Sequence, residues 1–235
     1  KDYARDYQFQ KSEMTYESLY LENKFEEMTF VLQIIDFFDF EEGLVVTLES
    51  GAPAGSGLGG SSAMGVTLYS ALCENFNISA DRNTIVKKVM GTEGRILNKG
   101  MPGYQDYFPA LTGGVLSLKG LPGEIEVEQL YSDELVSFLE SHITLVYSGI
   151  TRNSGINNWD VYKSFFDGDS EIRSAMNKIA KISFDTYQAI KSKSYDELLK
   201  LIGNEGEARK ALSPNIVPAE VTSFFNDLHS NGIVS

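Results

Sequence analysis

The stretch GAPAGSGLGGSSAMG, residues 51–65, constrains the fold more than any other part of the sequence. A β-rich segment at 43–50 precedes it, and a segment with apolar side chains at helical spacing follows it. A flexible linker would instead have polar flanks without periodicity. A strand–loop–helix unit directs the N–H groups of the loop and the positive end of the helix at one point. The pattern therefore predicts an anion site formed by the glycine loop.

Several protein classes bind phosphate with a glycine loop, and the neighbouring residues discriminate among them. A Walker A loop is excluded, because Gly60 is followed by Ser61 where that loop has a lysine. A protein kinase is excluded, because the chain has neither H-R-D nor D-F-G. Gly55, Gly57 and Gly60 match the dinucleotide fingerprint G-x-G-x-x-G. This alternative, an oxidoreductase, needs a strand that ends near the acidic Asp81, and the sequence there is short and polar.

The segment PAGSGLGGSSAMG, residues 53–65, resembles the central motif P-x-x-x-G-L-G-S-S-A of the GHMP kinases. That superfamily includes galactokinase, homoserine kinase, mevalonate kinase and phosphomevalonate kinase. The serine pair stands one position later here than in the family pattern. The resemblance implies a phosphate-binding loop at 53–63 with ATP as the cofactor. The residues that it implies for ATP binding are Pro53, Gly55, Gly57, Leu58, Gly59, Gly60, Ser61, Ser62 and Ala63.

Two acidic residues follow the loop at a spacing that suits phosphoryl transfer. Transfer to an alcohol needs Mg²⁺ to neutralise the phosphates and a group that receives the hydroxyl proton, and carboxylates suit both roles. Glu93 lies near the end of an expected helix, where an acid is not electrostatically favoured, and Asp106 follows in a Gly-Tyr-Gln-Asp loop. By resemblance, Glu93 and the hydroxyl of Ser62, or of Ser61, bind Mg²⁺. Asp106 is then the catalytic residue that contacts the attacking hydroxyl.

Two further segments resemble one branch of that superfamily, the heptose 7-phosphate kinases and fucokinases. GYQDYFPALTGGVLSL is similar to its Gly-x-Gln-Asp…Gly-Gly stretch, and YSGITRNSG is similar to its T-G-x-x-R-x-S. The acceptor in that branch is the anomeric hydroxyl of a sugar. The resemblance implies substrate contacts by Tyr104, Gln105 and Arg152, and a surface role for Arg152 is an equal alternative. Lys99 or Arg95 is a candidate to supply positive charge near the transferring group.

The function expected from these features is an ATP-dependent kinase acting on a small-molecule sugar or sugar phosphate, such as a heptose 7-phosphate. Galactose, fucose and mevalonate are alternative acceptors. A dinucleotide-dependent oxidoreductase is the alternative from another class. A regulator that keeps the kinase fold and binds ligand without turnover is a further alternative.

The composition limits the partners and the location. A net charge of −13 argues against nucleic acid and anionic membranes, but not against an anionic small molecule. Cys73 is the only cysteine, which excludes a disulfide framework, favours the cytoplasm and suits a buried position. His142 and His229 have no metal-like spacing, which argues against a zinc site. No apolar run approaches the ~20 residues that cross a bilayer. Nothing in the sequence indicates an oligomeric state.

Hydrophobic periodicity predicts the secondary structure around the loop. Helices are expected at 24–38, 61–76 and 79–97, the third capped by Ser79, and again from about residue 158 onward. Strands are expected at 43–50 and 141–149, and a hairpin at 113–130.

The resemblance implies the α+β class and the two-domain GHMP kinase fold. Residues 1–150 are expected to form its ribosomal protein S5 domain 2-like N-terminal domain. Residues 151–235 are expected to form part of a helix-rich α+β C-terminal domain. The N-terminal strand-and-loop segment and the glycine-rich C-terminal loop of the family have no counterpart in the sequence, so the fold is expected to be incomplete at both ends.

Overall fold

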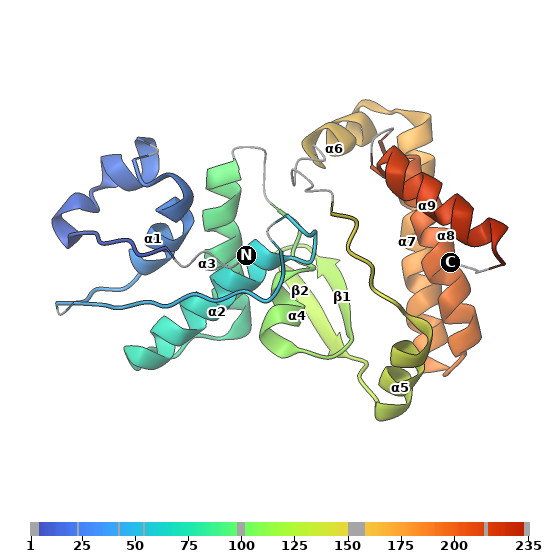
Figure 1. The fold of residues 1–235 in the computed structure, drawn as a ribbon, viewed down its shortest axis with the longest axis horizontal. Coiled ribbons are helices and arrows are strands. Elements are labelled where there is room, and N and C mark those ends of the chain that lie inside the picture. Colours follow the sequence, from blue (N-terminus) through green and yellow to red (C-terminus); the bar gives the residue numbers. More distant parts are fainter. Residues whose placement is uncertain are drawn as a thin grey trace. The chain divides into compact units, whose positions relative to one another are not determined.

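A computed structural model describes the chain at residues 5–22, 24–41, 43–53, 55–97, 102–149, 158–213 and 216–232. The contacts between residues divide the chain into two compact units (Figure 1). The first unit takes residues 1–54 and 58–113, and the second takes residues 55–57 and 114–235. The division into domains 1–150 and 151–235 stays a prediction. None of the helices over the described residues is long and apolar enough to span a membrane.

The first unit is helical, and its helices pack on one another around an apolar core. Its longer helices largely confirm the periodicity, although the first predicted helix is shortened by a 3₁₀ turn. Cys73 is buried on the second α-helix, as expected. The elements are the short helices η1 (Lys11–Glu13), η2 (Glu17–Leu21) and η3 (Glu26–Met28), followed by α1 (Thr29–Ile35), α2 (Gly60–Asn75), α3 (Arg82–Leu97) and α4 (Tyr107–Thr112). The side chains buried most completely in this core include Ile34, Val66, Val86, Val89 and Phe108.

Gly65 sets the distance between α2 and α3. A Cβ atom at this position would lie 2.5 Å from Val89 Cγ1 on α3 and 2.8 Å from Phe30 Cζ on α1. Real Cβ atoms do not approach neighbours so closely, so any larger residue would force the Val89 and Phe30 side chains, or the helices that carry them, to shift. The close approach matters for function, because the residues one turn away on each helix are then also brought together.

We expect Gly65→Ala to lower the free energy of unfolding of the first unit by about 1–2 kcal/mol. Overpacking a close helix crossing costs about 1–3 kcal/mol, which exceeds the gain of up to about 1 kcal/mol from the helix propensity of alanine. The matched control is Gly91→Ala on α3, where a Cβ would meet nothing within 4 Å. That variant should be unchanged or more stable in urea denaturation. Equal stability of the two variants would contradict the packing argument.

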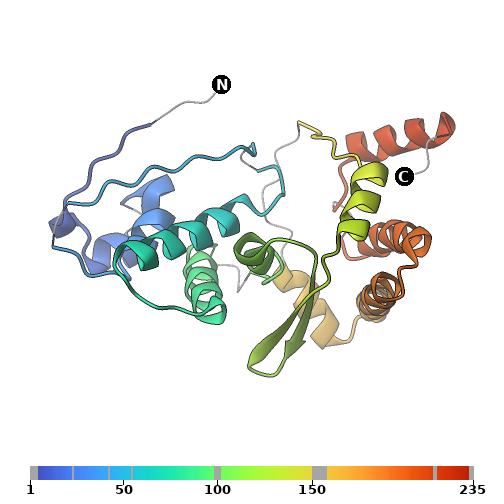
Figure 2. The same cartoon turned by 90° about the horizontal axis from the view of Figure 1, so that it is seen from below.

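The strand predicted at 43–50 is not formed. Residues 43–50 run as an extended trace without a neighbouring strand (Figures 1 and 2), and Val45 is 93% exposed. The strand predicted at 141–149 is also absent. Residues 141 and 142 form the end of a helix, and Leu145, which follows that helix, is 74% exposed. Both predictions are wrong for the same reason. A β-rich segment forms a strand only where another strand supplies hydrogen bonds, and no described segment pairs with either one.

The second unit begins with the predicted hairpin. β1 (Leu116–Leu121) and β2 (Glu124–Gln129) pair antiparallel, with Leu118 opposite Val127. Pro122 and Gly123 form the turn, and Gly123 has a φ of 85°, a conformation that suits glycine. This sheet and the helices together confirm the α+β class.

Helices make up the rest of the second unit. They are α5 (Asp133–His142), α6 (Asn158–Asp167), α7 (Ser170–Lys191), α8 (Tyr195–Lys210) and α9 (Ala219–Ser230). Sequence periodicity missed α5, which Ser132 caps by accepting a hydrogen bond from the Leu135 N–H at 3.2 Å. Helices α7 and α8 form a hairpin, with Ile182, Ala189, Leu201 and Ala208 buried between them.

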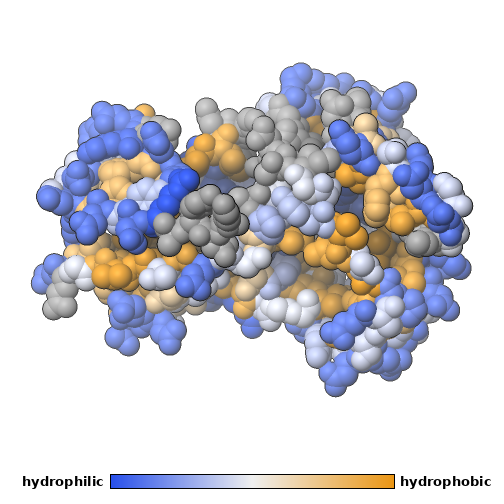
Figure 3. All heavy atoms as spheres, in the orientation of Figure 1, coloured by the Kyte–Doolittle hydropathy of each residue, from blue (hydrophilic) through white to orange (hydrophobic). Residues whose placement is uncertain are grey.

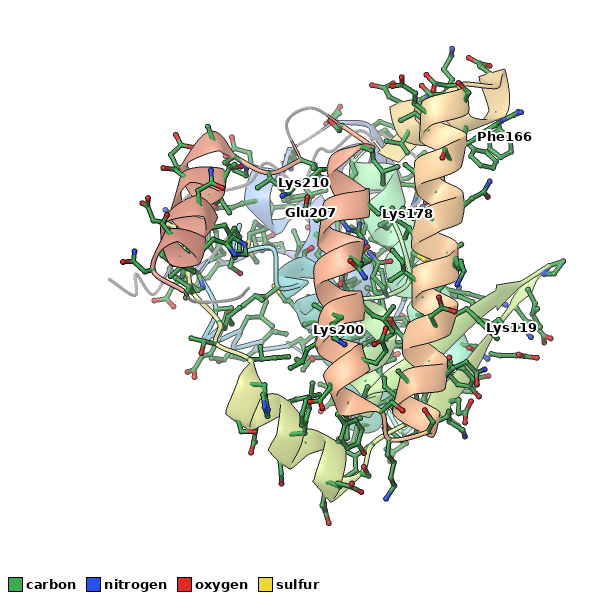
Figure 4. All side chains as sticks on the ribbon, turned by 90° about the vertical axis from the view of Figure 1, so that its right-hand side faces the viewer. Lys119, Phe166, Lys178, Lys200, Glu207 and Lys210 are labelled. Atoms are coloured by element: carbon green, nitrogen blue, oxygen red, sulfur yellow. The ribbon has the colours of Figure 1, made fainter. Side chains whose placement is uncertain are left out.

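The outer faces of this hairpin are charged (Figure 4). Lys178 on α7 and Lys200 on α8 are exposed there, as is Lys210, which pairs with Glu207 at 2.5 Å. Apolar side chains also reach the surface of both units, as Figure 3 shows. One of them is Phe166 at the end of α6, which is 76% exposed.

Candidate active site

The glycine loop leads directly into α2, as predicted. Gly55, Gly57 and Gly59 have φ values of 73°, 78° and 69°, a left-handed conformation that glycine adopts without strain. α2 then begins at Gly60, and no side chain caps its N-terminus. The first N–H groups of a helix lack partners within the helix and carry its positive end. The start of α2 is therefore suited to an anion.

The hydroxyls of the two serines at the start of α2 donate hydrogen bonds to a carboxylate on α3. Ser61 Oγ donates a hydrogen bond to Glu93 Oε1 at 2.6 Å, and Ser62 Oγ donates one to Glu93 Oε2 at 3.3 Å. The serines lie one turn before Gly65 on α2, and Glu93 lies one turn after Val89 on α3. The close contact between Gly65 and Val89 therefore brings the hydroxyls and the carboxylate together.

Asp106 reaches the same place from a third element. It immediately precedes α4, yet its side chain does not cap that helix. It packs instead against Gly59, where a Cβ would lie only 2.9 Å from Asp106 Cβ. Partial burial raises the pKa of the Asp106 carboxyl above its usual range, and the nearby Glu93 carboxylate raises that pKa further. The structure thus brings together the serine pair and both predicted acids within the first unit.

Tyr107 also belongs to this cluster, and the sequence reasoning missed it. Its hydroxyl donates a short hydrogen bond to Glu93 Oε2, and its side chain is fully buried. Burial raises the pKa of Tyr107, and the hydrogen bond to Glu93 raises that pKa further, so the phenol keeps its proton and remains a donor. The available signal was its position, directly after Asp106 at the start of an apolar helix.

The remaining predicted site residues are less constrained. Leu58 in the glycine loop is 54% exposed, and Pro53 is exposed as well. Tyr104 is half-buried and Gln105 is exposed on the loop that carries Asp106. Arg152 lies outside the described residues.

Of the two candidates for extra positive charge, the structure describes only Arg95. Lys99 lies outside the described residues. The guanidinium of Arg95 lies over the Tyr20 ring, 4.9 Å from its centroid. Among the described residues, no lysine or arginine forms an ion pair with Glu93 or Asp106. The role of Arg95 or Lys99 in transfer stays a prediction.

Asp81 has a structural role rather than the one that a dinucleotide site requires. Its Oδ1 accepts a hydrogen bond from the Thr84 N–H at 2.8 Å, and this bond lowers the pKa of its carboxyl. Asp81, and not Ser79 as predicted, is therefore the cap of α3. No described strand ends near Asp81, so the oxidoreductase alternative loses the element on which it depends.

Comparison with known proteins agrees with this arrangement. Residues 23–114, which include the glycine loop and both acids, match the family model described as GHMP kinases N terminal domain. A Bacteroides fragilis protein named L-fucokinase/L-fucose-1-P guanylyltransferase is 28% identical over 198 residues. A D-glycero-alpha-D-manno-heptose 7-phosphate kinase of Campylobacter jejuni is 26% identical over 188 residues. A bifunctional fucokinase/GDP-fucose pyrophosphorylase of Arabidopsis thaliana is 24% identical over 176 residues.

These alignments cover most of this chain but only part of each relative. The alignments with the Bacteroides, Campylobacter and Arabidopsis proteins cover 80%, 79% and 73% of this chain. They span 20%, 55% and 16% of the relatives themselves, in the same order. Residues 23–114, with the glycine loop, the serine pair and both acids, are thus similar to the N-terminal domain of the GHMP kinases, and the chain is similar to proteins named as sugar kinases.

Proposed function

We propose that this chain is the phosphate-binding part of an ATP-dependent kinase that phosphorylates a sugar hydroxyl. One observation carries the proposal. Two serine hydroxyls at the start of α2 bind Glu93, and Asp106 packs against Gly59 at the same helix end. Phosphoryl transfer requires an anion site, oxygen ligands for a cation and a base for a hydroxyl. The cluster offers groups for all three.

The ATP phosphates are proposed to lie on the backbone N–H groups at residues 55–62. The start of α2 supplies uncapped N–H groups and positive partial charge. The glycines leave room for the phosphates to approach the backbone. Pro53, Leu58 and Ala63 stay in this proposal as flanking residues of the loop.

The residues present also fit Mg²⁺. Over the described residues, the site has no group of three or more acidic, histidine or cysteine side chains, so the protein offers a partial ligand set. Mg²⁺ sites of kinases are of this kind, with one or two carboxylates and the substrate phosphates completing the octahedron. The charge of Glu93 already raises the pKa of Asp106, and a cation would relieve this repulsion. Glu93 and the hydroxyl of Ser62 or Ser61 would hold the ion, which would neutralise charge on the phosphates.

Asp106 is proposed to orient the acceptor and to receive its proton. The O–H bond of the sugar hydroxyl breaks as its proton moves to the Asp106 carboxylate. The hydroxyl oxygen forms a bond to the γ-phosphorus, the bond between that phosphorus and the bridging oxygen breaks, and ADP leaves. The raised pKa of Asp106 makes it a stronger base than an ordinary aspartate.

The proposed acceptor is the anomeric hydroxyl of a heptose phosphate or a related sugar such as fucose. The relatives named fucokinase and heptose 7-phosphate kinase support this choice. Tyr104 and Gln105 lie on the Asp106 loop and are proposed to contact the sugar. Arg152 is proposed to bind a sugar phosphate by bidentate hydrogen bonds. The protein is proposed to act in the cytoplasm without nucleic acid or membrane partners.

The test is an ADP-release screen of the purified protein with Mg²⁺·ATP. The panel contains heptose 7-phosphates, fucose, galactose and mevalonate, and mass spectrometry of the product identifies the phosphorylated position. We expect turnover with a sugar or sugar phosphate and phosphate on the anomeric oxygen. ATP binding without turnover on any acceptor would support a regulator instead, and turnover with mevalonate alone would contradict the sugar assignment.

A further inference from the structure

The two oxygens of the Glu93 carboxylate have different surroundings. Oε2 faces inward and accepts hydrogen bonds from Tyr107, which is 0% exposed, and from Ser62, which is 5% exposed. Oε1 accepts its hydrogen bond from the exposed Ser61. The carboxylate therefore has one oxygen held within the first unit and one oxygen directed toward the helix end at which the phosphates are proposed to lie.

We propose that Tyr107 is a positioning residue for the cation site. Its hydroxyl holds Oε2 of Glu93, so that Oε1 is presented to Mg²⁺ beside Ser61. This inference rests on the proposed function, because it assigns Tyr107 a purpose only if Glu93 binds a cation.

The position of Tyr107 gives it the rigidity that this role needs. Its ring is packed where α2, α3 and α4 meet, so the hydroxyl has a fixed location. Tyr107 is also the first residue of α4 and directly follows Asp106. One short segment thus fixes the orientation of Glu93 and the place of the proposed base.

Without such a hydrogen-bond donor, the Glu93 carboxylate would not be held in one orientation. Its side chain has three rotatable bonds, and the free carboxylate samples several orientations. Groups that hold a metal ligand by hydrogen bonds contribute about 10–100-fold to metal affinity. Tyr107 donates to Oε2 from a fully buried and rigidly packed ring, so we assign it the larger part of this effect.

The test is Tyr107→Phe, which removes the hydroxyl and keeps the buried ring. Mn²⁺ binding is followed by electron paramagnetic resonance in the presence of a non-hydrolysable ATP analogue. We expect the affinity for Mn²⁺ to fall about 10–100-fold. In turnover, the Mg²⁺ concentration for half-maximal rate should rise by a similar factor, and kcat at saturating Mg²⁺ should stay within about threefold. If Tyr107 only stabilised the fold, its substitution would not raise the Mg²⁺ requirement and leave kcat at saturating Mg²⁺ nearly unchanged.

The matched control is Tyr69→Phe. Tyr69 is a second mostly buried tyrosine of the same unit, and its ring packs against Phe37 and Phe38, about two turns along α2 from Ser62. Its Mn²⁺ affinity should equal that of the unsubstituted protein. Wild-type affinity in a folded Tyr107→Phe variant would overturn the inference and leave the proposed function intact. Absence of Mn²⁺ and nucleotide binding in the unsubstituted protein would overturn both.

A second measurement does not depend on the folding of Tyr107→Phe. The protein is labelled uniformly with 3-fluorotyrosine, and the ¹⁹F resonance displaced by Glu93→Gln is identified as the one that reports the contact. We expect Mg²⁺ with the ATP analogue to shift this resonance in the unsubstituted protein. A resonance that does not respond would also overturn the inference.

Discussion

Asp106→Asn is expected to lower kcat by about 10²–10⁴-fold, the usual contribution of a positioned proton acceptor. The amide has the shape of the carboxylate but cannot take the proton of the acceptor hydroxyl. ATP affinity should change little, because Asp106 packs against Gly59 through its Cβ and Cγ atoms, which the substitution keeps. ADP release measures the rate, and isothermal titration calorimetry with an ATP analogue measures the affinity.

The pH dependence of the same variant gives a second check. The carboxylate of Asp106 must be ionised to act as a base, so the rate should fall as pH decreases through its pKa. Burial and Glu93 raise that pKa in the free enzyme, so the acid limb of kcat/KM, which reports the free enzyme, should lie above the range of an ordinary aspartate. The residual rate of Asp106→Asn should not show this fall as pH decreases.

The control for Asp106→Asn is Asp167→Asn, which loses an exposed ion pair with Lys163 on α6. Its rate and its acid limb should match those of the unsubstituted protein. A near-normal rate in Asp106→Asn would remove Asp106 from the mechanism, whatever the behaviour of the control.

Glu93→Gln is expected to reduce Mg²⁺ affinity by at least about 10-fold, because the cation loses a charged oxygen ligand. It should also lower the pKa of Asp106, because the Glu93 charge is one of the two causes that raise it. The acid limb of kcat/KM, which reports the enzyme before Mg²⁺·ATP binds, should therefore lie at a lower pH than in the unsubstituted protein. If Glu93→Gln and the unsubstituted protein had the same Mg²⁺ dependence and the same acid limb, Glu93 would not be part of a cation site beside Asp106.

The local elements of the first unit were accessible to sequence reasoning because their signals are local. The glycine loop was recognised from its composition, and α2 and α3 from periodic apolar residues such as Ile85 and Val89. Glu93 and Asp106 were named from their chemistry and from the resemblance. Their proximity could not be derived from spacing, because it depends on the close contact of Gly65 with Val89 and on the packing of Asp106 against Gly59.

The errors have equally physical causes. The strands at 43–50 and 141–149 failed because strand formation depends on a pairing partner that local sequence does not specify. Tyr107 was missed because a tyrosine in an apolar run is ordinarily a core residue, and only the structure places its hydroxyl on Glu93. Ser79 and Asp81 both satisfy the preference for a helix cap, and the two-residue difference lies within the usual uncertainty of helix ends.

The most direct measurement is a crystal structure of the protein with Mg²⁺ and a non-hydrolysable ATP analogue. We expect the phosphates on the N–H groups at the start of α2. We expect the cation at about 2.0–2.1 Å from Glu93 Oε1 and from a serine hydroxyl, and Asp106 facing the γ-phosphate. An analogue bound elsewhere, with Glu93 and Asp106 remote from its phosphates, would contradict the proposed kinase site.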